Sequence, residues 1–187
     1  MMDYEYGNIG TKNLFEKIKK TKKVYIETGT YYGTGVAYAL NHFDEVHSIE
    51  ISERFYDPCV VKYKDNPKVK LHLGDSRVKL LEILKDTNKP CVIFLDAHGD
   101  INDQGPNPLY EELKSIKENS INNHIILIDD VRRMGDETDP CWSKIDKKKL
   151  HEMLKDINNE YHIFEYKDTL IAALKEDLNL SWWENNE

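Results

Sequence analysis

The sequence lacks the features that would direct it into a membrane, through an export pathway or onto a nucleic acid. Its 187 residues contain no apolar run near the roughly 20 residues that a bilayer-spanning helix needs. The acidic start, Met1 to Glu5, has neither the basic nor the apolar region of a signal peptide. Lys and Arg number 26 against 34 Asp and Glu, so the net charge of −8 argues against a phosphate-backbone partner. We therefore expect a cytoplasmic protein with no membrane partner and no nucleic-acid partner.

Cysteine is also scarce. The three cysteines, Cys59, Cys91 and Cys141, form an odd set without the spacing of a metal site, which fits a reducing compartment. A chain of 187 residues has the natural size of one domain. We divide it into an N-terminal helix (1–22), a cofactor- and metal-binding half (23–130), and an acceptor-side part with a loop, a helix, a hairpin and a tail (131–187).

Apolar periodicity alternates along the chain between the two-residue period of strands and the 3.6-residue period of helices. It predicts strands at 23–28, 44–51, 69–73, 90–96 and 124–129, and helices at 11–20, 33–42, 52–63, 76–85, 108–118 and 144–157. Two further strands, 161–166 and 169–174, are separated by only two residues, which forces an antiparallel hairpin. The expected fold class is α/β: a doubly wound, Rossmann-like, mostly parallel seven-stranded sheet with a C-terminal antiparallel β-hairpin.

The segment from Val24 to Gly35 is the most informative part of the chain. It reads as a buried strand that runs into a glycine turn and then a helix. Gly29 and Gly33 allow the backbone to approach a ligand closely, and the amides of the following helix point outward as donors. The same pattern also serves as a plain strand–helix connection, so other residues must decide between the two.

Acidic residues stand where the predicted parallel strands end. Ligands of doubly wound sheets bind outside these carboxyl ends. Ser52 and Ser76 already offer capping oxygens for two of the following helices, which favours a binding site over helix caps for the acids. The acids are Glu27, Glu50, Asp75, Asp96, Asp129 and Asp130.

With its loop Glu27-Thr28-Gly29-Thr30-Tyr31-Tyr32-Gly33, the chain resembles the class I S-adenosylmethionine (SAM) dependent methyltransferases from 24 to 174. The resemblance implies SAM as cofactor, with its methionine part in this loop and both ribose hydroxyls on Glu50. It places adenine at Gly74-Asp75-Ser76. An NAD-binding domain prefers G-x-G-x-x-G, whereas these glycines fall at 29, 33 and 35. The predicted cofactor residues are Glu27, Gly29, Thr30, Tyr31, Tyr32, Gly33, Thr34, Glu50, Ile51, Gly74, Asp75, Ser76 and Asp96.

A second constellation joins Asp96 to the pair Asp129 and Asp130, at the ends of two predicted neighbouring strands. Three converging carboxylates repel one another unless a cation joins them, and hard oxygen ligands suit Mg²⁺, or else Mn²⁺ or Ca²⁺. The pattern is similar to the metal-dependent O-methyltransferases of catechol, caffeoyl-coenzyme A and macrolide-sugar type. The competing interpretation is that Asp130 only caps a turn.

His98 is the candidate general base beside Asp96, since a near-neutral pKa suits removal of a hydroxyl proton. It is equally suited to be a fourth metal ligand. The resemblance implies metal-assisted O-methylation of a small hydroxylated molecule, such as a sugar or nucleotide sugar. Arg132 and Arg133 are candidates for an acceptor phosphate or for solvated loop residues. The loop 135–142 either lines the acceptor pocket, with Trp142 as its wall, or is a simple surface loop.

Two alternatives remain from the sequence. The segment Asp96-Ala97-His98-Gly99-Asp100 resembles the metal-binding segment of arginase-like manganese hydrolases, although the rest of their ligand set is missing. A non-catalytic SAM-binding module is the other. Only some twenty residues precede the first strand, so we expect the site to be open or to be covered by a partner subunit in a homodimer.

Overall fold

The computed structural model describes Phe15, Ile18 and the segments 21–98 and 106–179. Apart from Phe15 and Ile18, the predicted helix 11–20 lies outside the described residues, as does Asp100 of the hydrolase-like segment. Within the described part, no helix is both long and apolar enough to cross a membrane.

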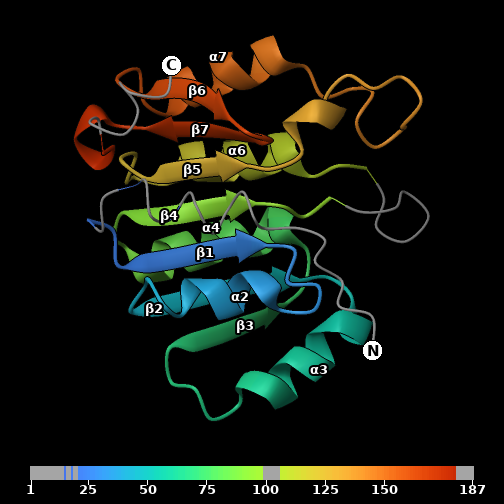
Figure 1. The fold of residues 1–187 in the computed structure, drawn as a ribbon, viewed down its shortest axis with the longest axis vertical. Coiled ribbons are helices and arrows are strands. Elements are labelled where there is room, and N and C mark those ends of the chain that lie inside the picture. The colour runs from blue at the N-terminus through green and yellow to red at the C-terminus, as the bar shows by residue number, and fades with distance from the viewer. Residues whose placement is uncertain (1–14, 16–17, 19–20, 99–105, 180–187) are drawn as a thin grey trace.

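All seven strands belong to one sheet with the order β3-β2-β1-β4-β5-β7-β6 (Figure 1). The first five strands are parallel, and β7 pairs with β5 and with β6 in the antiparallel sense. The predicted fold class is therefore confirmed. The strands are β1 (Val24–Thr28), β2 (Glu45–Glu50), β3 (Val69–Leu73), β4 (Cys91–Leu95), β5 (Ile125–Ile128), β6 (His162–Tyr166) and β7 (Thr169–Ala173).

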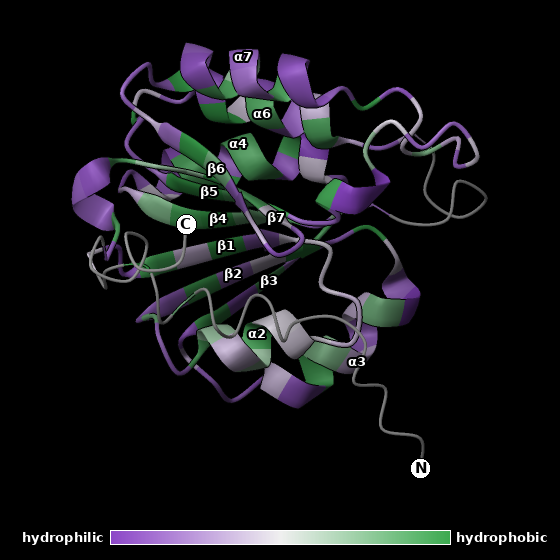
Figure 2. Ribbon diagram, turned by 45° about the horizontal axis from the view of Figure 1, so that its top comes forward, coloured by the Kyte–Doolittle hydropathy of each residue, from purple (hydrophilic) through white to green (hydrophobic). Residues whose placement is uncertain are grey.

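Helices cover both faces of the sheet, α4, α6 and α7 on one and α2 and α3 on the other (Figure 2). Their bounds are α2 (Thr34–Ala39), α3 (Glu53–Tyr63), α4 (Ser76–Thr87), α6 (Leu109–Glu118) and α7 (Lys147–Ile157), with short 3₁₀ turns at Val131–Arg133 and Lys175–Asp177. The first helix after β1 ends at Ala39, earlier than predicted. The last one starts later than predicted, because the side chain of Asp146 accepts a hydrogen bond from Lys149 N and fixes the start there.

The central strands are buried on both faces. Successive residues of β1 and β4 enter opposite apolar clusters: Ile26 and Ile93 pack under α4, α6 and α7, while Tyr25 and Phe94 pack under α2 and α3. This is why β4 is apolar throughout and β1 is apolar from Val24 to Ile26, with no alternation of polar residues in these stretches.

The topology sets where a ligand can bind. From β1 the chain winds outward through β2 to β3, and then returns to β4 and winds the other way. The connections therefore leave β1 and β4 in opposite directions, which opens a crevice at their carboxyl ends. The arrowheads of β1, β4 and β5 point to the same edge of the sheet in Figure 1.

Candidate functional site

A pocket of about 230 Å³ lies at this edge, outside the ends of β1 to β4. Its walls contain nine of the predicted site residues: Gly29, Tyr31, Glu50, Ile51, Gly74, Asp75, Ser76, Asp96 and His98. The remaining predicted residues, Glu27, Thr30, Tyr32, Gly33, Thr34, Asp129 and Asp130, are not in its lining.

Glu50, the last residue of β2, is oriented by two backbone amides. Its Oε2 accepts a hydrogen bond from Tyr31 N and its Oε1 accepts one from Ser52 N, both at 2.9 Å. The side chain is only 4% exposed, yet it lines the pocket. A carboxylate oxygen can accept two hydrogen bonds, and each oxygen of Glu50 accepts one from a backbone amide. Glu50 therefore retains acceptor capacity for two neighbouring hydroxyl groups.

Gly29 joins the ends of three strands. It closes β1, its N–H donates to Ile49 O of β2 at 2.9 Å, and a Cβ at its position would lie 2.4 Å from the Asp96 carbonyl oxygen, just past β4. Its φ of +87° is in the region that side chains rarely adopt. A glycine is therefore required here both by space and by backbone conformation.

Glu27 lies beneath the glycine loop and outside the pocket lining. Its carboxyl accepts hydrogen bonds from Ser48 Oγ at 2.7 Å and Tyr25 OH at 3.1 Å, and burial raises its pKa to about 8. Gly35 packs directly on this carboxyl, since a Cβ there would lie 2.1 Å from Oε2. Thr30, also buried, shares a 2.5 Å hydrogen bond with Ser48. In this arrangement Glu27 and Thr30 support the loop from below.

An aromatic cluster stands at the pocket mouth. Tyr31 and Tyr32 are each 58% exposed, and their rings lie 4.6 and 5.4 Å from that of Phe55. Gly33 caps α2 in a left-handed conformation, and Thr34 begins that helix. Tyr32, Gly33 and Thr34 thus shape the loop, while Tyr31 faces the pocket.

At the expected adenine position, Asp75 has a helix-capping role that the sequence interpretation gave to Ser76. The Asp75 carboxylate accepts a hydrogen bond from Arg77 N at 2.9 Å and pairs with the Arg77 guanidinium. This pairing holds the pKa of Asp75 below its usual range. Ser76 is already inside the helix, and its hydroxyl turns to the buried Glu112. Ser52 occupies the expected N-cap position of α3, but its side chain makes no capping bond.

The ends of β4 and β5 bring His98 close to two of the predicted acids, Asp96 and Asp130. His98 Nε2 lies 2.8 Å from Asp96 Oδ1 and 3.4 Å from Asp130 Oδ2. Burial raises the pKa of Asp96 although His98 opposes it, and burial together with the Asp96 charge raises the pKa of Asp129 to about 6. Burial acts to lower the pKa of His98, but Asp96 and the other two aspartates outweigh it and raise the pKa.

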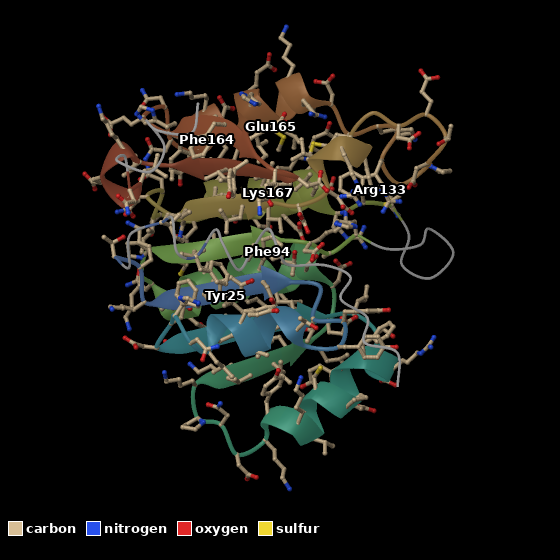
Figure 3. The ribbon with its side chains drawn as sticks, in the orientation of Figure 1. Tyr25, Phe94, Arg133, Phe164, Glu165 and Lys167 are labelled. Atoms are coloured by element: carbon tan, nitrogen blue, oxygen red, sulfur yellow. The ribbon has the colours of Figure 1, made fainter. Side chains whose placement is uncertain are left out.

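Two arginines lie against this acidic cluster. Arg132 Nη1 is 2.6 Å from Asp130 Oδ1 and also pairs with Asp168, and Arg133 pairs with Asp139 and approaches Asp130 at 3.5 Å. Arg133 is labelled near this edge in Figure 3. Both guanidinium groups therefore already have carboxylate partners. Asp130 itself has a left-handed φ of 57° and precedes a 3₁₀ turn, so the turn-capping position that we considered for it is real, although its side chain makes no capping bond.

Solved structures match this arrangement, whereas no protein-family model and no curated protein matches the sequence. The O-methyltransferase of Bacillus cereus in complex with SAH aligns with 83% of this chain and 76% of its own, at a TM-score of 0.61 and 21% identity. The chain has the fold of the class I SAM-dependent methyltransferases. The fibrillarin pre-rRNA processing protein of Methanococcus jannaschii aligns over 86% of this chain and 71% of its own, with a TM-score of 0.55 and 17% identity.

The methyltransferase fold also occurs in the MycE methyltransferase of the mycinamycin biosynthetic pathway, solved in complex with Mg and SAH. It shares 11% identity with this chain at a TM-score of 0.55, over 82% of this chain and 46% of MycE. At these identities the matches establish the fold, and the residues of this chain must carry any statement about chemistry.

Among the described residues, no group of three or more His, Cys, Asp and Glu side chains is arranged to hold a metal ion. The donor set fits a hard cation nonetheless, because Asp96, Asp129 and Asp130 supply only carboxylate oxygens and two of them have raised pKa values. The positions next to Asp130 are held by His98 and Arg132. The metal site thus stays a prediction, and it requires Arg132 to release Asp130.

The structure corrects the role expected for Trp142 within the methyltransferase fold. The side chain is 1% exposed and lies behind His98, with ring centroids 4.6 Å apart, so it does not form an open wall of the acceptor pocket. The apolar neighbours of Trp142 include Ile145 and Leu109 in the main core cluster. Its sequence position in a polar loop concealed this burial.

Sequence reasoning missed several pocket residues of the methyltransferase fold: Ile49, Phe55, Arg77, Ala97, Pro106, Asn107 and Pro108. Two of them had a usable signal. Arg77 follows an acidic strand end by two residues, the spacing that lets it pair with Asp75. Asn107 precedes Pro108 at the start of a helix, and its Oδ1 accepts a hydrogen bond from Leu109 N at 3.1 Å.

Proposed function

We propose that this protein is a SAM-dependent methyltransferase that transfers a methyl group to a hydroxyl group of a small molecule, assisted by a divalent cation. The observation that carries the proposal is Glu50. A buried carboxylate that closes β2, is fixed by two backbone amides and still faces a pocket is suited to a pair of vicinal hydroxyls such as those of a ribose.

The cofactor orientation follows from Glu50. Ile51 and Phe55 line the same pocket, and Gly74 and Asp75 line it just after the end of β3, which suits an adenine ring beyond the ribose. The glycine loop at Gly29 would hold the methionine part, next to the end of β4 where Asp96 and His98 line the same pocket. SAM as cofactor is supported by this order of residues and by the SAH bound to the neighbours of the same fold.

The chemistry would take place beside Asp96 and His98. His98 accepts the proton of the attacking hydroxyl in this scheme, and the neighbouring aspartates stabilise the resulting imidazolium. Asp96, Asp129 and Asp130 would hold Mg²⁺, Mn²⁺ or Ca²⁺, which when bound lowers the pKa of the acceptor hydroxyl. Positioning and deprotonation are what this chain contributes to an in-line displacement.

For the acceptor we propose a sugar, a nucleotide sugar or another hydroxylated small molecule. A net charge of −8 disfavours RNA, although one neighbour of the same fold is a pre-rRNA processing protein. The pocket opens at the sheet edge, and we propose a homodimer in which the partner subunit covers it. We also propose a cytoplasmic location, consistent with three free and buried cysteines.

Calorimetric titration with SAM, and separately with NAD, each with and without Mg²⁺, tests the proposal. Micromolar binding of SAM alone supports it. Binding of NAD would point to a dehydrogenase, and Mn²⁺ binding without either cofactor would favour the arginase-like hydrolase. SAM binding without turnover on any hydroxylated acceptor would leave the non-catalytic module, whereas methylation of RNA would contradict the small-molecule acceptor.

A double variant tests the metal part separately. Asp129→Ala with Asp130→Ala should abolish any stimulation by Mg²⁺ and leave SAM affinity within about threefold of the wild type, since neither side chain lines the pocket. Loss of SAM binding in this variant, with metal stimulation retained, would contradict the assignment of the two clusters.

A further inference from the structure

A second, smaller cavity lies behind the wall of the cofactor pocket. It has a volume of about 10 Å³ and is lined by residues at the ends of β4 and β5 and at the start of α6, and by Trp142. His98, Ala97 and Asn107 separate the two, because they line both. The volume is near the roughly 10–15 Å³ that a single water molecule requires.

Four polar atoms of the side chains lining this cavity are buried without a hydrogen-bond partner in the described part of the chain. One of them, His98 Nε2, lies 2.8 Å from Asp96 Oδ1, its ion-pair partner. The other three are Asn107 Nδ2, Trp142 Nε1 and Glu112 Oε1. An unsatisfied buried polar group costs about 1–3 kcal/mol, so three around one small cavity call for a shared partner. Two of the atoms donate and one accepts, which is the complement of a water molecule.

Glu112 also has contacts on the side away from the cavity. The hydroxyls of Ser76 and Thr28 hydrogen bond to its carboxyl group, and Thr28 Oγ1 in turn accepts from Asp96 N at 3.2 Å. Burial outweighs these bonds and raises the pKa of Glu112 to about 7. The Glu112 side chain is 1% exposed. Through these hydrogen bonds it connects the end of β1, the residue after β4 and the start of α4 from beneath the pocket.

We propose that the cavity binds one water molecule, which accepts hydrogen bonds from Asn107 and Trp142 and donates one to Glu112. Glu112 is then a positioning residue. Through the water it holds Asn107 and the Trp142 ring that backs His98, and through Thr28 it holds the backbone of Asp96. This site lies behind the acidic cluster, with His98 in the wall between them, and it does not depend on the proposed reaction.

Nuclear magnetic resonance of ¹⁵N-labelled protein tests the water site. The chain has three tryptophans, so the indole region contains few signals, and Trp142→Phe assigns the relevant one. We expect a cross-peak between the Trp142 indole proton and a long-lived water. Glu112→Gln should shift the indole signal and remove the cross-peak, because its amide group places a donor against either the two hydroxyls or the water.

The matched control is Glu111→Gln, one residue earlier on α6, where the side chain is 48% exposed and forms an ion pair with Lys114. It should leave the indole signal and cross-peak unchanged. A wild-type protein without the cross-peak, or a Glu112→Gln variant that retains it, overturns the water site. A crystal structure with Asn107, Trp142 and Glu112 bonded directly to one another would do the same.

Cofactor affinity tests the positioning role. Glu112→Gln should weaken SAM binding about three- to tenfold, the loss expected for one buried hydrogen bond, while Glu111→Gln has no effect. Thermal unfolding checks that both variants fold. Unchanged affinity in Glu112→Gln would overturn the positioning role. Absence of SAM binding in the wild type would instead contradict the proposed function, and the indole signal would still decide the water site.

Discussion

The two halves of the pocket edge are built in opposite ways. At the ends of β1 and β2, backbone amides donate hydrogen bonds to Glu50, and Gly29 approaches the backbone at Asp96 closely because it has no side chain. At the ends of β4 and β5, the His98 side chain lies between Asp96 and Asp130, and the Arg132 side chain supplies compensating charge at Asp130. The first half is held by the main chain, whereas the second is held by movable side chains.

This contrast separates binding from chemistry. Backbone donors keep their positions when a ligand arrives, so the cofactor half is preorganised. The acid cluster carries raised pKa values at Asp96 and Asp129, and it would change its protonation or its partners when a cation or an acceptor binds. Changes in the first half should therefore affect affinity strongly, and changes in the second half should affect metal and pH responses.

The largest expected effect comes from Gly29→Ala. The added Cβ would lie 2.4 Å from the Asp96 carbonyl oxygen at a φ of +87°, so the loop and β4 must separate. We expect loss of measurable SAM binding and a decrease of about 2–4 kcal/mol in the free energy of unfolding, measured by calorimetry and urea denaturation.

Gly135→Ala is the control for backbone strain alone. Its φ is +79°, but the nearest atom to an added Cβ is 3.9 Å away. A cost of about 1–2 kcal/mol with unchanged SAM affinity is expected. Equal effects of the two substitutions would show that the close approach of the loop to β4 is unimportant.

Glu50→Ala should have the next largest effect, on cofactor affinity. It removes a buried carboxylate from the pocket, and two hydrogen bonds to a charged group contribute about 1.5–3 kcal/mol each. SAM affinity should fall about 100-fold or more, with and without Mg²⁺, in a calorimetric titration. Glu53→Ala, an exposed acid in the first turn of α3, should change it less than twofold. A small effect of Glu50→Ala would remove the main support for the cofactor assignment.

Glu27→Gln tests whether the buried carboxyl group beneath the glycine loop makes the stability of the protein depend on pH. Burial raises the pKa of Glu27 from 4.5 to about 8, so the folded protein keeps a proton that the unfolded chain releases above about pH 4.5. Wild-type stability therefore falls as the pH rises from about 4.5 to about 8, and the Glu27 contribution is constant above that range.

The Gln side chain keeps the shape but cannot ionise. The melting temperature of Glu27→Gln relative to the wild type should rise by a few degrees between pH 5 and pH 8.5. Glu112 and Asp129 titrate in both proteins and cancel from this difference. A difference that is independent of pH would mean that Glu27 is ionised in the folded protein throughout this range.

The smallest expected effect is a gain, from Arg132→Ala. Arg132 is 65% exposed and competes for Asp130, so its removal should tighten Mg²⁺ binding about two- to fivefold and leave SAM affinity unchanged. Lys147→Ala removes the same charge from an exposed pair with Glu165 and should have no effect on either. Weaker Mg²⁺ binding in Arg132→Ala would show that the arginine helps to build the acid cluster.

Much of the fold could be predicted because the residue types of a strand indicate whether it is buried. Strands such as Cys91–Leu95 are apolar throughout, and a two-residue connection at Lys167 and Asp168 permits only a hairpin. Helix ends were less accessible. The start of α7 depends on which side chain reaches a free amide, and Asp146 does so at 2.7 Å.

Parts of the site were predictable for the same reason. The carboxyl ends of parallel strands meet at one edge, so Glu50, Asp96 and His98 could be placed together from their sequence positions alone. The direction of each side chain could not. Glu27 and Glu50 both close strands, yet the first is beneath the loop and the second faces the pocket.

The sequence by itself determined the order of strands and helices, the glycine loop and the row of acids, because periodicity and local turn chemistry are properties of neighbouring residues. Only the tertiary structure decided which charges meet. Asp130 pairs with Arg132 because of the directions of their side chains. The contacts of Trp142 with His98, and of Glu112 with Thr28 and Ser76, join segments that are distant in sequence. Packing sets those contacts, and no local pattern records them.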